Sequence, residues 1–421
     1  MAASYMIVTP MKHYLLSASL FILLILQGTT VFAEPLRPFP QHVTYAPETI
    51  KPNHRPQDEL DADIKAFYDN WKAAYVIPAG TTPNGHPLYR VSVGTTDPNR
   101  TVSEGQGYGM VIVAIMAGYD LEAETIFDGL WEFSRQYPSS IDSRLMAWEV
   151  PPGNSNSDSA FDGDVDIAYG LLLADAQWGS TGRINYAAEA KTVITAILES
   201  TIGPSSRLPM LGDWVEPDGS LYNQYTPRSS DFILNCFRAF RRVTDDSNWD
   251  TVVANVQAAI TSLQTRYSHK TGLLPDFIVY RKGRPKPAPR QFLESPYDGR
   301  YYYNAGRDPW RLGTDALLNN DLTSMAQVRK MSNWIQLAAK NDPANIRAGY
   351  RLNGKSLPGS KYFTTFFVAP FGVAAMTNPD QQQWLNKIYD TVYNTHEDYY
   401  EDTVTLLTLL VMTGNYWDPT Q

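Results

Sequence analysis

Carboxyl groups in three widely separated segments are the side chains best suited to chemistry in this 421-residue chain. Glu104 stands in "SEGQGYGM", Asp162 opens the cluster "DGDVD", and Glu294 lies in "FLESPYDG". A protonated carboxyl group can donate a proton and an ionised one can accept it, so two such groups in opposite states support acid–base catalysis. This chemistry requires a fold that brings the three segments together.

The surroundings of Glu104 are unusual because Gly105, Gly107 and Gly109 follow it before the apolar run "MVIVAIMAGY". Ser103 predicts a helix N-cap, which places Glu104 in the first turn. Each glycine weakens a helix by about 0.5–1 kcal/mol relative to alanine, but together they leave one side of the turn bare for a ligand or another backbone. A helix start favours ionised Glu104. A proton donor therefore needs an apolar wall or a second carboxylate nearby; the alternative is an ordinary first-turn acid at a tight helix crossing.

Three acids, Asp162, Asp164 and Asp166, precede the apolar stretch "IAYGLLLADAQW". One Asp is enough to cap a helix, so three within five residues exceed what capping requires. Calcium binding is an alternative, because alternating acids resemble the start of an EF-hand loop. However, Ile167 and Asp175 fall near the places where that loop needs its glycine and its last glutamate.

Helical periodicity dominates the chain and predicts an all-α fold. The expected helices span 57–76, 103–118, 121–136, 162–178, 184–200, 229–243, 248–266, 307–319, 322–340, 360–376, 380–393 and 400–413. Twelve helices with mostly short connections make six helical hairpins, which can close into an (α/α)6 barrel. An open α-solenoid is the alternative, although no fixed-period repeat is present. Three long loops rich in Trp, Tyr, Asp and Pro end where helices begin, and we expect them to form a cleft.

The first residues have the pattern of a secretory signal peptide. Lys12 and His13 precede an apolar stretch over 14–33 that ends in the small-residue pattern before Ala33. We expect cleavage after Ala33, a secreted protein, and a single domain over 34–421. A membrane anchor is the alternative, and Met11 is a second candidate start.

The composition excludes several classes of function. A net charge of −9 argues against nucleic acid and anionic membranes as partners, and it is compatible with a neutral or cationic substrate. The single cysteine, Cys236, lies on an apolar face and is predicted to belong to the core. The six histidines are scattered without metal-ligand or triad spacing. We expect no metal, no cofactor and a monomer.

Four motifs together resemble glycoside hydrolase family 8: "SEGQGYGM", "DGDVDIAYGLLLADAQW", "RSSDF" followed by "FRAF", and "YYYNAGRDPWR". They stand in the order and at the spacing of that family, and the resemblance covers nearly all of residues 34–421. It implies an (α/α)6 barrel and an endo-acting, inverting hydrolase of β-linked glucans, xylans or chitosan.

The resemblance also implies roles for individual residues. Glu104 matches the general acid, and Asp162 matches the Asp that interacts with the distorted sugar. Phe161 and Gly170 depart from the pattern, since Ser or Thr and Ser or Ala are usual there; the shape beside Asp162 therefore stays open.

The general base is the discriminating position. Many members carry Asp where this chain has Asn304, and an amide cannot accept the proton of water. In one subgroup the base is a Glu ten residues earlier, which is the position of Glu294. This match selects the subgroup that resembles chitosanases, lichenases and endoglucanases of bacilli. Inversion requires the two carboxyl groups to stand about 6.5–9.5 Å apart.

Substrate binding is predicted for aromatic and polar residues of the motifs and loops, although each aromatic residue taken alone fits a core position as well. The predicted residues are Tyr108, Trp148, Trp214, Asp231, Tyr303, Asn304, Arg307 and Trp310, with Tyr222, Tyr301 and Tyr302 as further aromatic candidates.

Chitosan is the favoured substrate, with overlapping β-1,4-glucan activity, because the loop acids Glu149, Glu216 and Asp218 would attract a protonated amine. An endo-β-glucanase without chitosanase activity is the first alternative. A non-catalytic carbohydrate-binding protein and a polysaccharide lyase are alternatives from other classes.

Overall fold

The computed structural model describes residue 1 and residues 34–151 and 157–421, so the predicted signal peptide lies outside the described residues. The helices are α1 (Gln57–Tyr75), α2 (Ser103–Ile115), α3 (Ala123–Gln136), α4 (Phe161–Trp178), α5 (Tyr186–Ser200), α6 (Leu234–Thr244), α7 (Asn248–Tyr267), α8 (Asp308–Asn319), α9 (Leu322–Ala338), α10 (Ala369–Met376), α11 (Gln382–Tyr393) and α12 (Tyr399–Met412). Three two-stranded antiparallel pairs are formed by β1 (Val76–Thr81) with β2 (Pro87–Val91), β3 (Thr101–Val102) with β4 (Glu149–Val150), and β5 (Ile278–Arg281) with β6 (Arg284–Pro287). In this described part, no helix is both long and apolar enough to cross a membrane.

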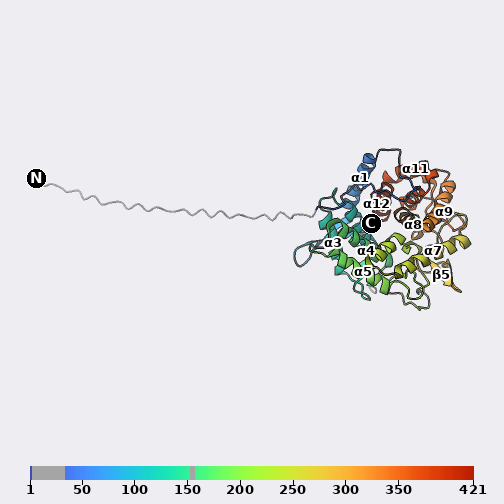
Figure 1. The fold of residues 1–421 in the computed structure, drawn as a ribbon, viewed down its shortest axis with the longest axis horizontal. Helices are drawn as coiled ribbons and strands as arrows, with labels where there is room; N and C mark the ends of the chain where they lie inside the picture. Colours follow the sequence, from blue (N-terminus) through green and yellow to red (C-terminus); the bar gives the residue numbers. More distant parts are fainter. Residues whose placement is uncertain (2–33, 152–156) are drawn as a thin grey trace. The chain divides into compact units, whose positions relative to one another are not determined.

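The even-numbered helices form an inner ring. Each contacts the next, from α2 through α4, α6, α8 and α10 to α12, and α12 contacts α2 again. The odd-numbered helices pack outside them, and Figure 1 shows α1, α3, α5, α7, α9 and α11 around the edge of the 34–421 unit. This closed ring of six hairpins confirms the predicted (α/α)6 barrel and excludes the open solenoid.

Burial explains which helices lie inside. On α1 the buried side chains recur at helical spacing, at Leu60, Ile64, Phe67 and Trp71, so one face packs and the other meets solvent. On α10 all eight residues are buried, as expected for a helix surrounded by protein. Cys236 of α6 is also fully buried, which confirms its predicted place in the core.

The glycines after Glu104 serve a close helix crossing. A Cβ atom added to Gly107 would lie 2.8 Å from Cβ of Asp166 and 2.9 Å from the backbone oxygen of Gly163. A Cβ atom on Gly163 would lie 2.7 Å from the backbone nitrogen of Glu104. The backbones of α2 and α4 therefore touch where their acidic first turns begin, and the approaching group predicted at this turn is another backbone.

Two predicted helices begin much later than expected, at Leu234 instead of 229 and at Ala369 instead of 360. The span 360–376 shrinks to α10, because a 3-10 turn at Thr365–Phe367 precedes it and Pro370 sits in its first turn, where proline favours a helix start. The span 229–243 shrinks to α6 for a similar reason, since Ser229–Asp231 forms a separate 3-10 turn.

Candidate active site

The amino-terminal ends of the inner helices meet at one rim of the ring. Glu104 lies in the first turn of α2, Asp162 lies in the first turn of α4, and Arg307 directly precedes α8. Nη1 of Arg307 donates hydrogen bonds to Glu104 and, at 2.8 Å, to Oδ2 of Asp162. The structure thus brings together two predicted carboxyl groups around one guanidinium group. The start of α12 also reaches this rim, because the hydroxyl group of Tyr399 lies 2.3 Å from where a Cβ atom of Gly105 would stand.

Arg307 is itself held by two further hydrogen bonds. Its Nη2 atom donates to Oγ of Ser230 at 2.8 Å and to Oδ1 of Asn304 at 3.1 Å. Only 1% of Arg307 is exposed, so the ion is removed from water and depends on these partners. Arg307 therefore positions Glu104 and Asp162 as a buried ion. This corrects the prediction that Arg307 binds substrate directly.

Glu104 and Asp162 have opposite protonation preferences. Burial raises the pKa of Glu104 to about 7; Arg307 opposes this rise, and the negative charge of Asp162 adds to it. Burial also disfavours the charged form of Asp162, but Arg228 and Arg307 outweigh it and hold the pKa of that carboxyl group below its usual range. The pair thus consists of one carboxyl group that carries a proton near neutral pH and one that stays ionised.

Glu294 is the most accessible of the three predicted catalytic carboxyl groups. Its side chain is 46% exposed, against 17% for Glu104 and 3% for Asp162. Nδ2 of Asn304 donates to Oε2 of Glu294 at 2.7 Å, while Oδ1 of the same amide accepts from Arg307. Asn304 therefore links the exposed carboxylate to the guanidinium group that holds Glu104.

Two buried aspartates that the sequence interpretation overlooked shape the loops around this link. Asp298 accepts from the backbone nitrogen atoms of Leu293 at 2.7 Å and Glu294 at 3.1 Å. Asp276 accepts from the backbone nitrogen atoms of Tyr302 at 2.9 Å and Ala305 at 2.8 Å. The loops carrying Glu294 and Asn304 are therefore each fixed by a buried carboxyl group. Asp298 stands in the quoted segment "FLESPYDG", and its position four residues after Glu294 could have indicated that it supports that loop.

Arg228 is a third residue that the sequence interpretation missed. It contacts Oδ1 of Asp162 at 2.9 Å, Oδ1 of Asp231 at 3.0 Å and Oε1 of Glu294 at 4.0 Å. It thus places one positive charge between the buried carboxylates and the exposed one. Arg228 is the first residue of the quoted motif "RSSDF", and this position was its signal in the sequence.

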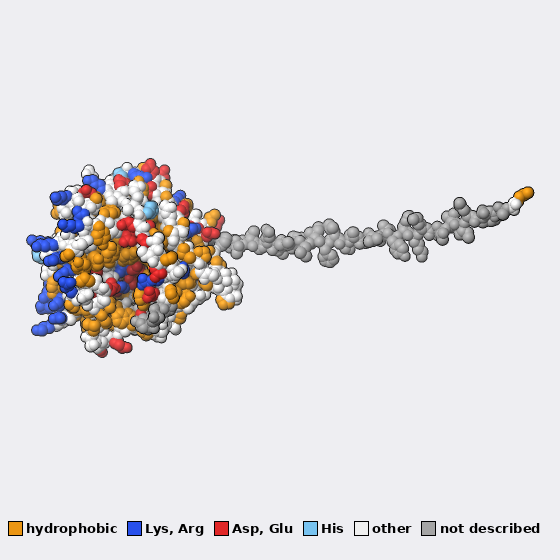
Figure 2. Space-filling view, turned by 180° about the vertical axis from the view of Figure 1, so that it is seen from behind, with side chains coloured by type: hydrophobic (Ala, Val, Ile, Leu, Met, Phe, Trp, Pro, Cys, Tyr) orange, Lys and Arg blue, Asp and Glu red, His pale blue; other side chains and the backbone are white. Residues whose placement is uncertain are grey.

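A cavity of about 450 Å³ opens beside Glu294. Its lining includes Trp148, Trp214, Tyr222, Arg228 and Phe277. The Tyr222 ring packs edge-on against Trp214 with centroids 5.3 Å apart, which fixes both orientations. Figure 2 shows a hollow on one face of the 34–421 unit, where acidic side chains lie among apolar ones. Trp148 and Trp214 therefore stand where a sugar chain beside Glu294 could contact them.

Several other predicted contacts are contradicted by burial. Tyr108 is fully buried and Trp310 is 2% exposed, so neither presents a face to a sugar. Tyr303 differs from these two, because it is half-buried and only one face of its ring is covered by Phe366, at a centroid distance of 5.3 Å and an interplanar angle of 12°; its predicted sugar contact stays a prediction. Asp231 is fully buried, and burial raises its pKa to about 7 although Arg228 opposes the rise.

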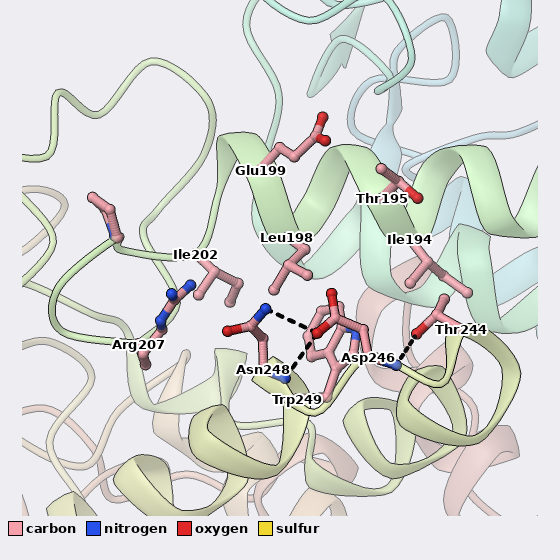
Figure 3. Close-up of a pocket in the computed structure, with 11 residues that line it drawn as sticks. Ile194, Thr195, Leu198, Glu199, Ile202, Arg207, Thr244, Asp246, Asn248 and Trp249 are labelled. Carbon is pink, nitrogen blue, oxygen red and sulfur yellow. Dashed lines mark hydrogen bonds between the residues drawn. The ribbon is translucent and has the colours of Figure 1, made fainter.

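A second cavity, of about 380 Å³, lies between α5 and the connection from α6 to α7 (Figure 3). Asn248 donates to Oδ1 of Asp246 from both its backbone and its side chain, at 2.9 and 2.8 Å. Glu199 on the opposite wall pairs with Arg144 at 2.8 Å. This cavity contains none of the predicted catalytic residues, and its carboxylates already have partners.

A barrel of six helical hairpins, with Glu104 and the exposed Glu294 linked through Arg307 and Asn304 at one aromatic-lined rim, has the parts that an inverting glycoside hydrolase requires. The family model "Glycosyl hydrolases family 8" matches residues 61–414. The chain belongs to this family.

Its relatives include the "Beta-glucanase" of Niallia circulans, 44% identical over 94% of this chain and 94% of that protein. The "Endoglucanase" of Bacillus sp. (strain KSM-330) is 39% identical over 92% of this chain and 83% of its own length. The solved "Beta-1,3-1,4-glucanase from Paenibacillus sp.X4" superimposes with a TM-score of 0.84 and 42% identity, covering 91% of this chain and 99% of that one.

Proposed function

We propose that this protein is an endo-acting β-glucanase that hydrolyses its polymer with inversion. The observation that carries the proposal is the pairing of a buried acid with an accessible carboxyl group: Glu104, with a pKa of about 7, and the exposed Glu294, with Arg307 and Asn304 between them. From the predicted signal peptide we also propose that the enzyme is secreted and acts outside the cell.

In this mechanism Glu104 protonates the glycosidic oxygen as the bond breaks. Glu294 takes a proton from the water molecule that attacks the opposite face of the sugar ring. Asp162, kept ionised by Arg228 and Arg307, stabilises positive charge that develops on the ring. Asn304 orients Glu294 through its amide and has no proton-accepting role.

Glucan replaces chitosan as the proposed substrate for two reasons. The relatives named above are β-glucanases and endoglucanases. In addition, the loop acids that favoured a cationic sugar lie outside the lining of the cavity beside Glu294, and Glu149 is paired with Arg100 at 2.5 Å.

The substrate test compares reducing ends released from lichenan, carboxymethyl cellulose and chitosan under identical conditions. We expect lichenan to be cleaved fastest and chitosan slowest, and nuclear magnetic resonance of the first products to show the α-anomer. Faster release from chitosan would return the assignment to chitosanase. Unsaturated products that absorb ultraviolet light would indicate a lyase, and an inert protein would indicate a carbohydrate-binding function.

The pH dependence follows from Glu104. A general acid works in its protonated form, and the pKa of Glu104 is about 7 instead of the ordinary 4.5, chiefly because of burial. We expect kcat/KM on β-glucan to be fully developed below pH 6 on this limb and to fall about tenfold per pH unit above 7. A basic limb centred near pH 5 would contradict the assignment, since kcat/KM reports the free enzyme.

A further inference from the structure

The β5–β6 hairpin and the residues after it carry a cluster of cationic side chains on a protein with a net negative charge. The segment from Phe277 to Leu293 contains no Asp or Glu but carries five cations, although the whole chain has a net charge of −9. The five are Arg281, Lys282, Arg284, Lys286 and Arg290. Four are exposed and Lys286 is half-buried. In Figure 1 β5 lies at the right; the corresponding left margin of the reversed view in Figure 2 shows a concentration of Lys and Arg side chains.

These cations stand out because they lack partners among the residues that the structure describes. Within the described part of the chain, none of the five forms an ion pair or a side-chain hydrogen bond. By contrast, Arg228 contacts three carboxylates, and Arg238 of α6 pairs with Asp315 and Asp321. The charges of the hairpin are therefore available to a ligand.

The geometry of the hairpin keeps like charges close together. Arg281 and Arg284 are direct cross-strand partners on either side of a two-residue turn. Like charges directly opposite each other destabilise a strand pair. Lys282 in the turn has φ 51°, in the region that favours Asn or Gly, so a third cation occupies a position where another residue type fits better. An anion bound here would relieve this repulsion.

A cavity of about 330 Å³ lies between this hairpin and α7. Tyr225 and Tyr280 line it with their ring centroids 5.8 Å apart, and Arg284 stands beside them. Asn255 and Ser262 of α7 add an amide and a hydroxyl group to the lining. Aromatic faces with amide and hydroxyl groups suit a sugar, while the planar guanidinium group suits a carboxylate or phosphate.

We propose that this cavity and the adjoining cations form a second glycan-binding site, specific for polysaccharide that bears carboxylate or phosphate groups. The sugar ring packs against Tyr225 and Tyr280, and its anionic substituent pairs with Arg284 and Arg281. No residue of this cavity lines the one beside Glu294, so the proposal is independent of the hydrolytic reaction.

The lining favours a glycan over nucleic acid or a lipid surface. Tyr225 is 40% exposed, so its ring is accessible, and it packs beside Tyr280, so the two rings together offer a surface of the size of a sugar ring. The amide of Asn255 and the hydroxyl group of Ser262 can bond to the hydroxyl groups of a sugar ring, whereas DNA presents no free hydroxyl groups along its chain.

The test measures binding by affinity electrophoresis in the Glu104→Gln background, so that no polymer is cut. The gels contain carboxymethyl cellulose, a soluble phosphorylated glucan, or neutral hydroxyethyl cellulose. We expect Arg281→Ser/Arg284→Ser to raise the Kd for the anionic polymers about tenfold or more at low salt, and to leave binding to hydroxyethyl cellulose unchanged. Loss with only one anionic polymer identifies the charged group that the site reads.

A charge-matched control, Lys191→Ser/Lys387→Ser, removes two exposed cations from α5 and α11 and should behave as the background protein. Tyr225→Ala should weaken binding of the anionic glycans without changing the charge. Unchanged binding in the arginine double variant would overturn the proposal. So would an inert Tyr225→Ala together with equally tight binding of single-stranded DNA, because the site would then respond to charge alone.

Discussion

Glu104→Gln should lower kcat on β-glucan by about 10²–10⁴-fold, the usual contribution of general acid catalysis. Glutamine has nearly the same shape and can still accept a hydrogen bond from Arg307, so the arrangement of Arg307 and its partners is kept. It cannot transfer a proton to the departing oxygen. Retardation by hydroxyethyl cellulose should therefore survive while turnover is lost.

An aryl β-cellobioside with a dinitrophenol leaving group gives the sharper measurement, because this group departs without protonation. We expect Glu104→Gln to lose far less activity on it than on the polymer. Glu199→Gln, an exposed acid of α5, is the matched control and should be fully active. Equal losses on both substrates would mean that Glu104 is not the proton donor.

Glu294→Gln should cause a second loss of about 10²–10⁴-fold in kcat. The amide oxygen can still accept from Asn304, and Asp298 still holds the loop backbone, so the variant removes proton affinity and little else. The control is Glu216→Gln, an exposed acid of the neighbouring long loop, which should retain activity.

Replacement by alanine separates the base role from a structural role. Glu294→Ala leaves space beside the attacking water, and azide, which needs no base, should restore part of the rate and give the α-glycosyl azide. A wild-type rate in Glu294→Gln would refute the base assignment. Failure of azide to restore any rate, combined with lost polymer binding, would show that Glu294 only shapes the site.

The sequence predicted the helices well because their apolar positions follow the helical period over long stretches. It failed at α10, where a local 3-10 turn and Pro370 delay the helix start without changing the apolar character of the segment. The ring closure itself came from counting hairpins, and the contact between α12 and α2 confirms it.

The site was predictable only where chemistry lies in a local motif. Glu104 and Asp162 each stand in a recognisable segment, and the ten-residue spacing between Glu294 and Asn304 corresponds to a direct hydrogen bond. Arg228 was missed, although it opens the quoted motif "RSSDF", because two of its three partners, Asp162 and Glu294, come from other segments. Tyr108 and Trp310 were misassigned because aromatic content does not reveal which side of a helix faces the core.

The shared rim has an electrostatic consequence. Helices carry partial positive charge at their amino ends, and α2, α4 and α8 all begin at the rim where Arg228 and Arg307 also lie. These converging dipoles act in the same direction as the two guanidinium groups and help to keep Asp162 ionised although it is buried. The ring therefore supplies part of the charge balance of its own site through the direction in which its inner helices run.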